Sequence, residues 1–439
     1  MESMHDNHQE PSIWVRQATT IKGLVIFVLT MLLLIPTSMI ESLIFERQGR
    51  QQEAVAEVSG KWGRQQNLAG PFLILPYEQT LRNADGKITD KVMKHAFYLP
   101  DALKINGQVQ PELRHRGIFE VVLYSSDLIL EGSFGKLQTD QFIPADAQIL
   151  WEQAQLALSI PDLRGLKDQV KLDWDAQSSL FDPGIPVSGL AESGIHVPIS
   201  LQKEANGAHT FKISLALKGS GSLFFTPVGK VTEVAISAPW ADPSFSGAFL
   251  PEEKQIDGNS FTANWKVLNL NRNYPQQWLG EANTSYAESA FGVDFLLPVD
   301  NYQKSTRSVK YAILFISLTF LTIFFIEMRQ KTRVHAFQYA LIGLALVIFY
   351  TLLVSISEHL SFDSAYLIAA IMTIALTTLY ANALFASRQM AFLVGGTLTV
   401  LYGFLFVVLQ QQDYALLIGS IGLFLILAAV MYFSRKIEW

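Results

Sequence analysis

The densest group of residues that could carry out chemistry is formed by Glu112, Arg114, His115 and Arg116. A carboxylate and an imidazole three residues apart could act as a general acid and a general base. Nothing beside them in the sequence supplies a nucleophile, or a third group that would orient the imidazole. The segment runs into strand-forming residues, so we interpret it as a solvated cluster of charges at a strand edge.

A second group could supply paired carboxylates. Asp173 and Asp175 flank Trp174, and Asp182 follows seven residues later. Two carboxylates on either side of a glycosidic bond can cleave it. Acidic pairs beside loops are common, however, and nothing else in the segment points to a sugar substrate, so we do not assign these residues a catalytic role.

The remaining candidates lack the spacing that their chemistry requires. His95, His196 and His209 do not show the spacing of metal ligands. The Gly-Ser-Gly-Ser segment at 219–222 lacks the lysine of a phosphate-binding loop and reads as a turn between strands. We therefore predict no catalytic residue, no metal and no cofactor, and we expect a protein that is not an enzyme.

The composition indicates a membrane protein. Half of the 439 residues are hydrophobic and only 16% are charged, against roughly 25% in soluble domains. There is no cysteine, which excludes disulfides and thiolate metal sites. The net charge is −6 and there is no basic run, so nothing suggests nucleic-acid binding.

Six segments are apolar over the length needed to cross a bilayer, about 20 residues. The predicted spans are residues 23–43, 308–327, 335–357, 364–385, 390–409 and 414–433. Residues 1–22 and 434–439 form short tails, and residues 44–307 have the mixed polarity of a globular domain. The first span is longer than the apolar region of a signal peptide and no cleavage site follows it, so we expect an uncleaved signal anchor.

The charges of the short loops predict the orientation. With a cytoplasmic N-terminus, the cytoplasmic side carries eight basic residues, and the two short outer loops, at 358–363 and 410–413, carry none. The eight are Arg16, Lys22, Arg329, Lys331, Arg333, Arg388, Arg435 and Lys436. Lys304, Arg307 and Lys310 oppose this bias, but they border a long translocated domain, where the rule is weak. We expect both termini in the cytoplasm and residues 44–307 outside the inner membrane, in the periplasm.

The central domain reads as β-rich. Residues 117–134, 209–240 and 260–272 contain short runs of β-branched and aromatic residues broken by turn residues. This pattern predicts antiparallel sheets in a sandwich-like arrangement. Residues 44–63 have apolar residues at helical spacing and predict a helix that leads in from the membrane. Residues 97–121 and 249–267 share a Leu-Pro, lysine, Asn/Asp-Gly order, which fits either a duplicated hairpin or two unrelated Asn/Asp-Gly turns.

Polar and small residues inside the spans predict helix packing. Ala391, Gly395, Thr399 and Gly403 recur every four residues and would let a neighbouring helix approach closely. Asn382 and the threonines of residues 373–378 fit hydrogen bonds between helices, and alternatively a substrate path.

Several strings resemble the CreD family of bacterial inner-membrane proteins over nearly the whole chain. They are VSGKWGRQQNLAGPFLILPY (58–77), RHRGIFEVVLYSSDL (114–128), FFTPVGKVTEVAISAPWADPSFSGAFLP (224–251), WKVLNLNRNYPQ (265–276) and FGVDFLLPVDNYQKSTRSVKYAILFISLTFLTIFFIE (291–327). The residues that match the family pattern most specifically are Trp62, Gly63, Gln66, Gly70, Pro71, Pro76, Asp300, Tyr302, Arg307, Lys310 and Tyr311. We interpret them as structural residues where the outer domain joins the membrane.

The resemblance implies a protein of the Gram-negative inner membrane, controlled by a two-component regulon and linked to envelope integrity, including tolerance to colicins and β-lactams. It implies no catalytic residue. The favoured hypothesis is a non-enzymatic protein of envelope maintenance or envelope stress. Its partners would be the lipid bilayer and an unidentified periplasmic or membrane protein. A transporter or lipid flippase, and a membrane-tethered hydrolase of cell-wall glycan, are the alternatives.

Overall fold

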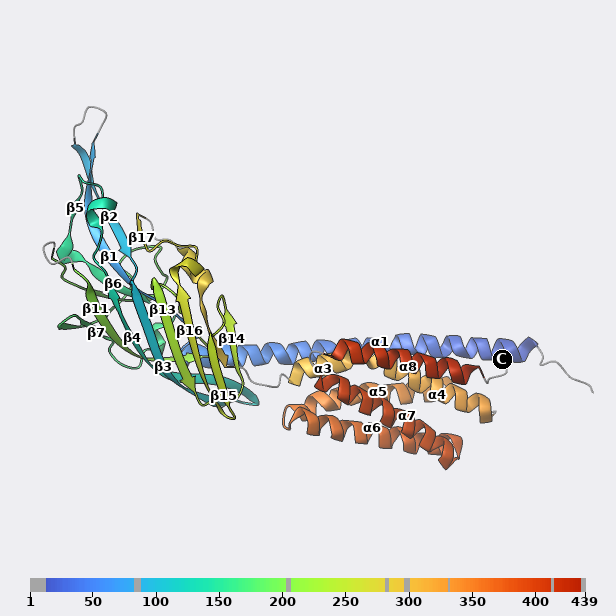
Figure 1. Cartoon of the computed structure of the whole chain (residues 1–439). Helices are drawn as coiled ribbons and strands as arrows, with labels where there is room; N and C mark the ends of the chain where they lie inside the picture. Colours follow the sequence, from blue (N-terminus) through green and yellow to red (C-terminus); the bar gives the residue numbers. More distant parts are fainter. Residues whose placement is uncertain are drawn as a thin grey trace, which may run out of the picture. The chain divides into compact units, whose positions relative to one another are not determined.

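The computed structural model describes residues 13–82, 88–202, 207–280, 284–295, 301–330, 332–411 and 414–435. It divides into two compact units (Figure 1). Residues 1–51 and 299–439 make up the helical unit, and residues 52–298 make up the β unit. The boundary falls inside the first helix, so this helix contributes residues to both units. Asp300 lies outside the described residues.

The helices of the chain are α1 (Ile13–Trp62), α2 (Thr139–Phe142), α3 (Asn301–Lys310), α4 (Ala312–Gln330), α5 (Ala336–Ser357), α6 (Phe362–Phe385), α7 (Arg388–Gln410) and α8 (Ala415–Ser434). The strands are β1 (Gln66–Arg82), β2 (Ile88–Tyr98), β3 (Ala102–Arg116), β4 (Phe119–Phe134), β5 (Gln148–Ile149), β6 (Gln155–Ser159), β7 (Lys171–Trp174), β8 (Gln177–Leu180), β9 (Asp182–Pro183), β10 (Gly194–Pro198), β11 (His209–Ser220), β12 (Ser222–Thr226), β13 (Val231–Ala238), β14 (Pro243–Gly247), β15 (Glu253–Asp257), β16 (Ser260–Leu268), β17 (Gln277–Leu279) and β18 (Phe291–Phe295).

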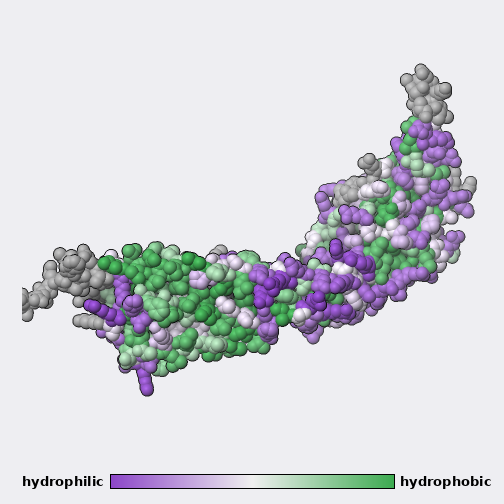
Figure 2. Space-filling view, turned by 180° about the vertical axis from the view of Figure 1, so that it is seen from behind, coloured by the Kyte–Doolittle hydropathy of each residue, from purple (hydrophilic) through white to green (hydrophobic). Residues whose placement is uncertain are grey.

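The helical unit contains helices that are long and apolar enough to cross a membrane. Among the described residues there are five: Thr20–Trp62, Ala312–Gln330, Ala336–Ser357, Phe362–Phe385 and Arg388–Gln410. The described apolar part of α8, Leu417–Tyr432, is shorter. Five spans are therefore confirmed in length and composition, and the sixth remains a prediction. Hydrophobic residues cover most of the visible face of this unit, whereas the β unit is mainly hydrophilic outside (Figure 2).

Neighbouring helices of the unit pack through small residues at some positions and not at others. A Cβ atom at Gly395 of α7 would lie 2.5 Å from the Thr378 Oγ1 of α6, so these helices need glycine there. Ala391 is buried as well. Thr399 and Gly403 are exposed, and a Cβ at Gly403 would meet no described atom within 4 Å. The expected ladder of small residues therefore packs only over its first half, because residues four apart on a helix drift around its axis and Thr399 and Gly403 no longer face α6.

The β unit is built from two sheets. The strand order of one is β14-β18-β12-β1-β6-β10-β9, with β2, β5 and β17 added beside this path, and that of the other is β15-β16-β13-β3-β4-β11-β7-β8. Most pairs are antiparallel, as predicted. Two are parallel, β1 with β12 and β3 with β13. The sheets are therefore mixed, because the chain crosses between them instead of folding back at every turn.

One turn expected from the sequence is instead such a crossing. The Gly-Ser-Gly-Ser segment does not form a hairpin: β11 belongs to one sheet and β12 to the other, with Gly221 at φ +70° between them. The two Asn/Asp-Gly pairs are also not equivalent. Asn106 and Gly107 lie inside β3, whereas Gly258 forms the turn from β15 to β16. The structure therefore gives no support to a duplicated hairpin.

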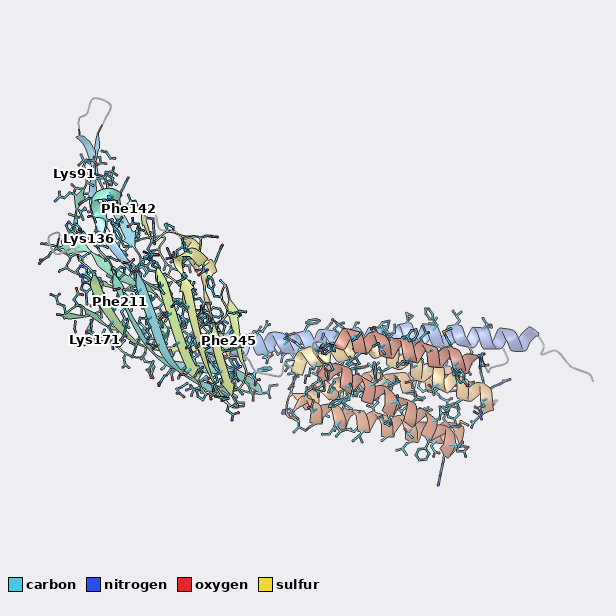
Figure 3. The ribbon with its side chains drawn as sticks, in the orientation of Figure 1. Lys91, Lys136, Phe142, Lys171, Phe211 and Phe245 are labelled. Carbon is cyan, nitrogen blue, oxygen red and sulfur yellow. The ribbon has the colours of Figure 1, made fainter. Side chains whose placement is uncertain are left out.

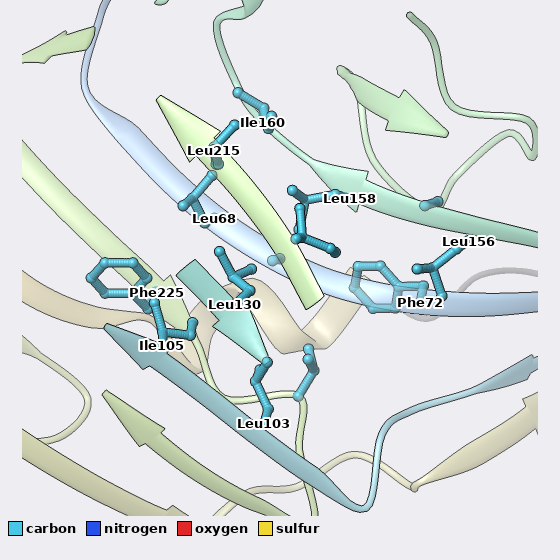
Figure 4. Close-up of a cluster of buried hydrophobic side chains, with 14 of the residues drawn as sticks. Leu68, Phe72, Leu103, Ile105, Leu130, Leu156, Leu158, Ile160, Leu215 and Phe225 are labelled. Atoms are coloured by element: carbon cyan, nitrogen blue, oxygen red, sulfur yellow. The ribbon is translucent and has the colours of Figure 1, made fainter. Parts of the chain in front are cut away.

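The core of the β unit lies between the two sheets. Alternate residues of β13 and β16 are buried, which is the pattern of strands with one face toward the core. Leu103, Ile105 and Leu130 of one sheet meet Phe72 and Phe225 of the other (Figure 4). Phe211 and Phe245 lie within the sheets, while Lys91 and Lys171 lie at the periphery (Figure 3).

Candidate functional site

The last turn of α1 is fixed to the strands that follow it. The helix ends at Trp62, and Gly63 follows at φ +151°. A Cβ atom at Gly63 would lie 2.9 Å from the carbonyl oxygen of Lys218 in β11, so only glycine lets the chain pass this close. The Gly63 amide donates to the Ser59 carbonyl at 2.9 Å and closes the helix end. The Trp-Gly pair is therefore a junction between the helix and a sheet.

The indole of Trp62 lies between two cations. The Arg114 guanidinium is 4.2 Å from the ring centroid and the Lys218 ammonium is 4.3 Å from it. Both distances suit cation–π attraction. The indole N–H donates to the carbonyl of Tyr124 in β4 at 3.3 Å. One side chain at the end of α1 thus contacts β3, β4 and β11.

A groove of about 320 Å³ opens beside this tryptophan. Its lining is Glu57, Val58, Lys61, Trp62, Arg114, Arg116 and Leu123. Glu57 accepts from Lys61 at 2.7 Å and from Arg116 at 3.1 Å. The rim is therefore charged and exposed, with three cations and one carboxylate, and the floor includes the apolar Val58 and Leu123. Such a lining fits a small anionic group better than an apolar ligand.

Gln66 and Asp162 complete the junction beneath the groove. The buried Gln66 amide donates to the carbonyls of Asp162 at 3.0 Å and Lys218 at 3.3 Å. Asp162 accepts from the side chain of Arg164 at 2.9 Å and from the Arg64 amide at 3.0 Å. Burial alone would raise the pKa of the Asp162 carboxyl. The hydrogen bonds from Arg164 and Arg64 outweigh this effect, so the pKa lies below its usual range. The carboxylate is held charged at neutral pH.

Gly70 and Pro71 shape the first strand. Their peptide bond is cis, and Gly70 has φ +128°. A Cβ at Gly70 would lie 3.0 Å from the Ala157 carbonyl, and the pairing of β1 with β6 shifts register between Ala69 and Phe72. The two residues form an irregularity that bends β1. Both residues therefore shape the backbone of β1.

The second set of family-pattern residues lies in the helical unit. The Tyr302 hydroxyl donates to Glu358 at 3.1 Å, and Arg47 lies 3.5 Å from the same carboxylate. The Arg307 guanidinium donates to the Gln411 carbonyl at 2.8 Å, beyond the end of α7. Lys310 is exposed. The hydroxyl of Tyr311 would lie 3.3 Å from a Cβ at Gly419. Tyr302 and Arg307 thus join α3 to the C-terminal ends of α5 and α7.

The residues considered for catalysis are dispersed. Glu112 pairs with Arg114 at 2.9 Å, and His115 pairs with Glu120 across the hairpin at 3.3 Å. Asp173 accepts from Lys171 at 3.0 Å and from Ser178 at 2.5 Å. Asp182 stands in β9, in the other sheet. The described residues contain no group of three or more potential metal ligands, and the carboxylates do not converge.

One histidine and one aspartate do come together, in a pair that the sequence reading did not make. His209 Nδ1 lies 2.7 Å from Asp175 Oδ2, and its ring stacks on Trp174. Burial raises the pKa of Asp175, but hydrogen bonds from His209 and Thr210 outweigh it and lower the pKa. The pair closes the end of the β7–β11 ladder, since Asp175 also accepts from the Thr210 amide at 2.8 Å.

The sequence did not identify two further buried charged residues, Arg272 and Glu327. Arg272, 8% exposed, donates to the carbonyls of Tyr274 at 2.7 Å and Val228 at 3.1 Å, and burial lowers its pKa. Glu327, 6% exposed, accepts from Lys22, from the Tyr339 hydroxyl at 3.0 Å and from the Val334 amide at 2.9 Å. A charged residue flanking a strand or a span ordinarily reads as surface, so no local pattern marks either one.

Fold and site together define a class: a multi-helix membrane protein that carries a large β unit after its first helix. The family model described as "Inner membrane protein CreD" matches residues 18–439. The inner membrane protein CreD of Escherichia coli (strain K12) is 29% identical over 419 residues, which cover 94% of this chain and 92% of that protein. This chain belongs to the CreD family of inner-membrane proteins.

Proposed function

We propose that this chain is a non-enzymatic protein of envelope maintenance, whose β unit lies in the periplasm and binds an anionic envelope component at the Trp62 groove. The single observation that carries the proposal is the groove itself. Exposed cations surround it, and the residues that build it hold α1 to the sheets. A ligand bound there would contact the one helix that runs on into the helical unit.

The charges of the groove support an anionic ligand. Lys61, Arg114 and Arg116 have side chains that are 75%, 49% and 59% exposed, and Glu57 is shared by two of them. A phosphate or carboxylate could replace Glu57 as the partner of Arg116, because guanidinium groups bind both kinds of anion in two-point geometry. Bilayer phospholipid and cell-wall polymers both offer such groups.

The periplasmic placement rests on the charge bias of the short loops. Reporter fusions at Gln330 and at the C-terminus should report cytoplasm, and fusions at Gly207 and Ser361 should report periplasm. A cytoplasmic signal at Gly207 would overturn both the orientation and the envelope role. The uncleaved anchor is tested separately: N-terminal sequencing of the mature protein should recover residues 1–40.

The groove is tested by complementation of a deletion strain under β-lactam or detergent stress. Replacing Arg114 and Arg116 together by alanine should reduce rescue at least tenfold at normal protein level. The matched control is Lys171→Ala with Lys212→Ala, because these are also exposed, ion-paired cations on the β unit. Equal rescue by both double variants would remove the groove from the proposal.

A transporter or lipid flippase is the second candidate. The path first considered for it, along Asn382 and the threonines of α6, does not form one surface, because Asn382 is exposed while Thr373 and Thr377 are buried. Other buried hydroxyls in the helical unit, among them Ser308, Thr319 and Tyr402, are the observation that favours a transporter or flippase as the second candidate.

A further inference from the structure

A stripe of buried residues, three of which carry hydroxyl groups, runs along one face of α3 and α4. It consists of Ser305, Ser308, Ala312, Phe315 and Thr319, spaced alternately by three and four residues, which places them on one helix face. Each is at most 1% exposed. The Tyr311 amide donates to the Ser308 carbonyl at 3.1 Å and the Phe315 amide donates to the Tyr311 carbonyl at 3.3 Å, so helical bonding continues across the joint between α3 and α4.

The helices that pack against α3 and α4 add two more hydroxyls. Both α3 and α4 pack against α5 and α7. The ring of Tyr402, on α7, lies 4.9 Å from Phe315 and 4.5 Å from Phe349 of α5. Phe349 contacts the ring of its neighbour Tyr350. The two tyrosines and the stripe therefore belong to one region, the seam between α3–α4 and α5–α7.

Five hydroxyls of this seam are buried and have no protein partner among the described residues: Ser305, Ser308, Thr319, Tyr350 and Tyr402. Serine and threonine hydroxyls in helices can bond to a carbonyl one turn earlier, but those of Ser305, Ser308 and Thr319 do not. Their neighbours do so: Thr322 donates to the Leu318 carbonyl at 2.8 Å and Ser357 to the Val354 carbonyl at 3.0 Å. An unpaired buried hydroxyl is costly, and five in one seam call for an occupant that forms hydrogen bonds.

We propose that the seam is a hydrated site that takes water between α3–α4 and α5–α7. From Ser305 to Thr319 it spans 14 residues, or roughly 20 Å at 1.5 Å per residue. Its end beside α3 carries the polar groups Asn301, Lys304, Arg307, Glu358, Asp363 and Gln410. These groups give water a polar entrance at that end. A hydrated site would give the helical bundle a function other than anchoring the chain in the membrane. The proposal does not depend on the Trp62 groove or on the orientation of the chain in the membrane.

Hydration can be tested with single cysteines, because the chain has none of its own. Ser305→Cys, Ser308→Cys and Thr319→Cys should react, in open membrane fragments, with small hydrophilic methanethiosulfonates that require a thiolate in water. The matched control is Ile313→Cys, which lies between the stripe positions on α4 and is 41% exposed on the bundle surface. We expect the seam cysteines to react at least tenfold faster than Cys at position 313. Open fragments expose both sides of the membrane, so a wrong orientation would not affect the result.

Reaction rates no faster than at the Ile313 position for all three seam variants, each shown to be folded by its detergent melt, would overturn the proposal. A second measurement needs no new thiol. If water bonds to the Tyr402 hydroxyl, Tyr402→Phe should lower the melting temperature of the full chain. In a dry seam, the same change removes an unsatisfied polar group and should raise the melting temperature, which would also overturn the proposal.

Discussion

The hydroxyls of buried tyrosines find different kinds of partner in the β unit and in the helical unit. In the β unit the hydroxyls of Tyr124, Tyr274 and Tyr286 donate to the carbonyls of Ser222, Pro227 and Leu190. Tyr98 is an exception there. In the helical unit the hydroxyl of Tyr339 donates to the Glu327 carboxylate and that of Tyr366 to the Tyr402 carbonyl. The hydroxyls of Tyr350 and Tyr402 are just as buried but have no protein partner among the described residues.

The difference follows from the backbone. Sheets leave carbonyls free at strand ends and crossovers: Ser222 begins β12 and Pro227 follows it. A helix uses almost all its carbonyls in its own ladder, so a hydroxyl between helices seldom finds one, although Tyr366 of α6 donates to the Tyr402 carbonyl of α7. The same residue type therefore ties strands together through backbone carbonyls in the β unit, while two of its members in the helical unit are left unpaired in the seam.

The largest loss of stability is expected from substitutions at the Trp62 junction of the β unit. Trp62→Ala removes two cation–π contacts and an indole hydrogen bond, and we expect it to lower the free energy of unfolding of the β unit by about 2–4 kcal/mol. Trp62→Phe keeps an aromatic face and should cost about half as much. Pulse proteolysis of the purified full chain in urea, following fragments of the β unit, measures both. Equal stability of all three proteins would show that the junction does not hold the unit together.

In the helical unit, leucine substitutions at two glycines of α7 distinguish the face that packs against α6 from the exposed face. Gly395→Leu forces its side chain against Thr378 and should cost about 1–3 kcal/mol. Gly403→Leu should stay within about 0.5 kcal/mol, because nothing described lies against it. Thermal melts in detergent compare the two. A larger loss at Gly403 would mean that another helix covers the second half of α7.

The tie made by Tyr124 can be compared with the unpartnered Tyr402. Tyr124→Phe leaves the Ser222 carbonyl without its donor in the core and should cost about 1–2 kcal/mol. Tyr402→Phe breaks no bond to protein, so any change it causes reports on the seam alone. The two variants are measured side by side by the same melt. A stabilised Tyr124→Phe would contradict the role of that hydrogen bond.

Asp162 gives the junction a dependence on pH. Its pKa in the folded protein is lowered, so its contribution is present above the unfolded value of about 4 and is lost as the pH falls through the lower folded value. Asp162→Asn should cost about 1–2 kcal/mol at neutral pH, and its difference from wild type should shrink below about pH 4. Urea midpoints at several pH values test this. If the difference in urea midpoint between wild type and Asp162→Asn were the same at every pH, the loss of stability would come from the shape of the side chain and not from its charge.

The smallest effect is expected at the histidine–aspartate pair. Asp175→Asn and His209→Ala should each leave rescue of the deletion strain within about twofold, since we assign the pair only to the end of a strand ladder. Protein level is checked by immunoblot. Loss of rescue at normal abundance would favour the membrane-tethered hydrolase over the envelope-binding protein.

Local pattern was sufficient for much of the architecture. Apolar length predicted five helices that the structure contains, because a bilayer demands about 20 residues regardless of fold. The strand runs at 117–134 and 260–272 became β4 and β16, since period-two alternation reflects one buried face. The lead-in helix at 44–63 became the end of α1.

Long-range pairing was beyond the sequence. The Gly-Ser-Gly-Ser segment looks like a hairpin turn, yet it carries the chain from one sheet to the other, and no residue within it encodes the partner of β12. The Asp175–His209 contact joins positions 34 residues apart, and the Lys22–Glu327 ion pair joins positions 305 residues apart. Such contacts follow from which elements become neighbours, which a single sequence does not list.

The sequence by itself determined the membrane character of the chain, the place of the β unit after the first helix and the family, since each depends on local composition or on strings of residues. Only the tertiary structure decided which polar residues are tied and which are left in the seam. Trp62 came to line a groove because the fold places Arg114 of β3 and Lys218 of β11 against its ring. Ser308 became a seam residue because α5 and α7 cover it without offering a free carbonyl.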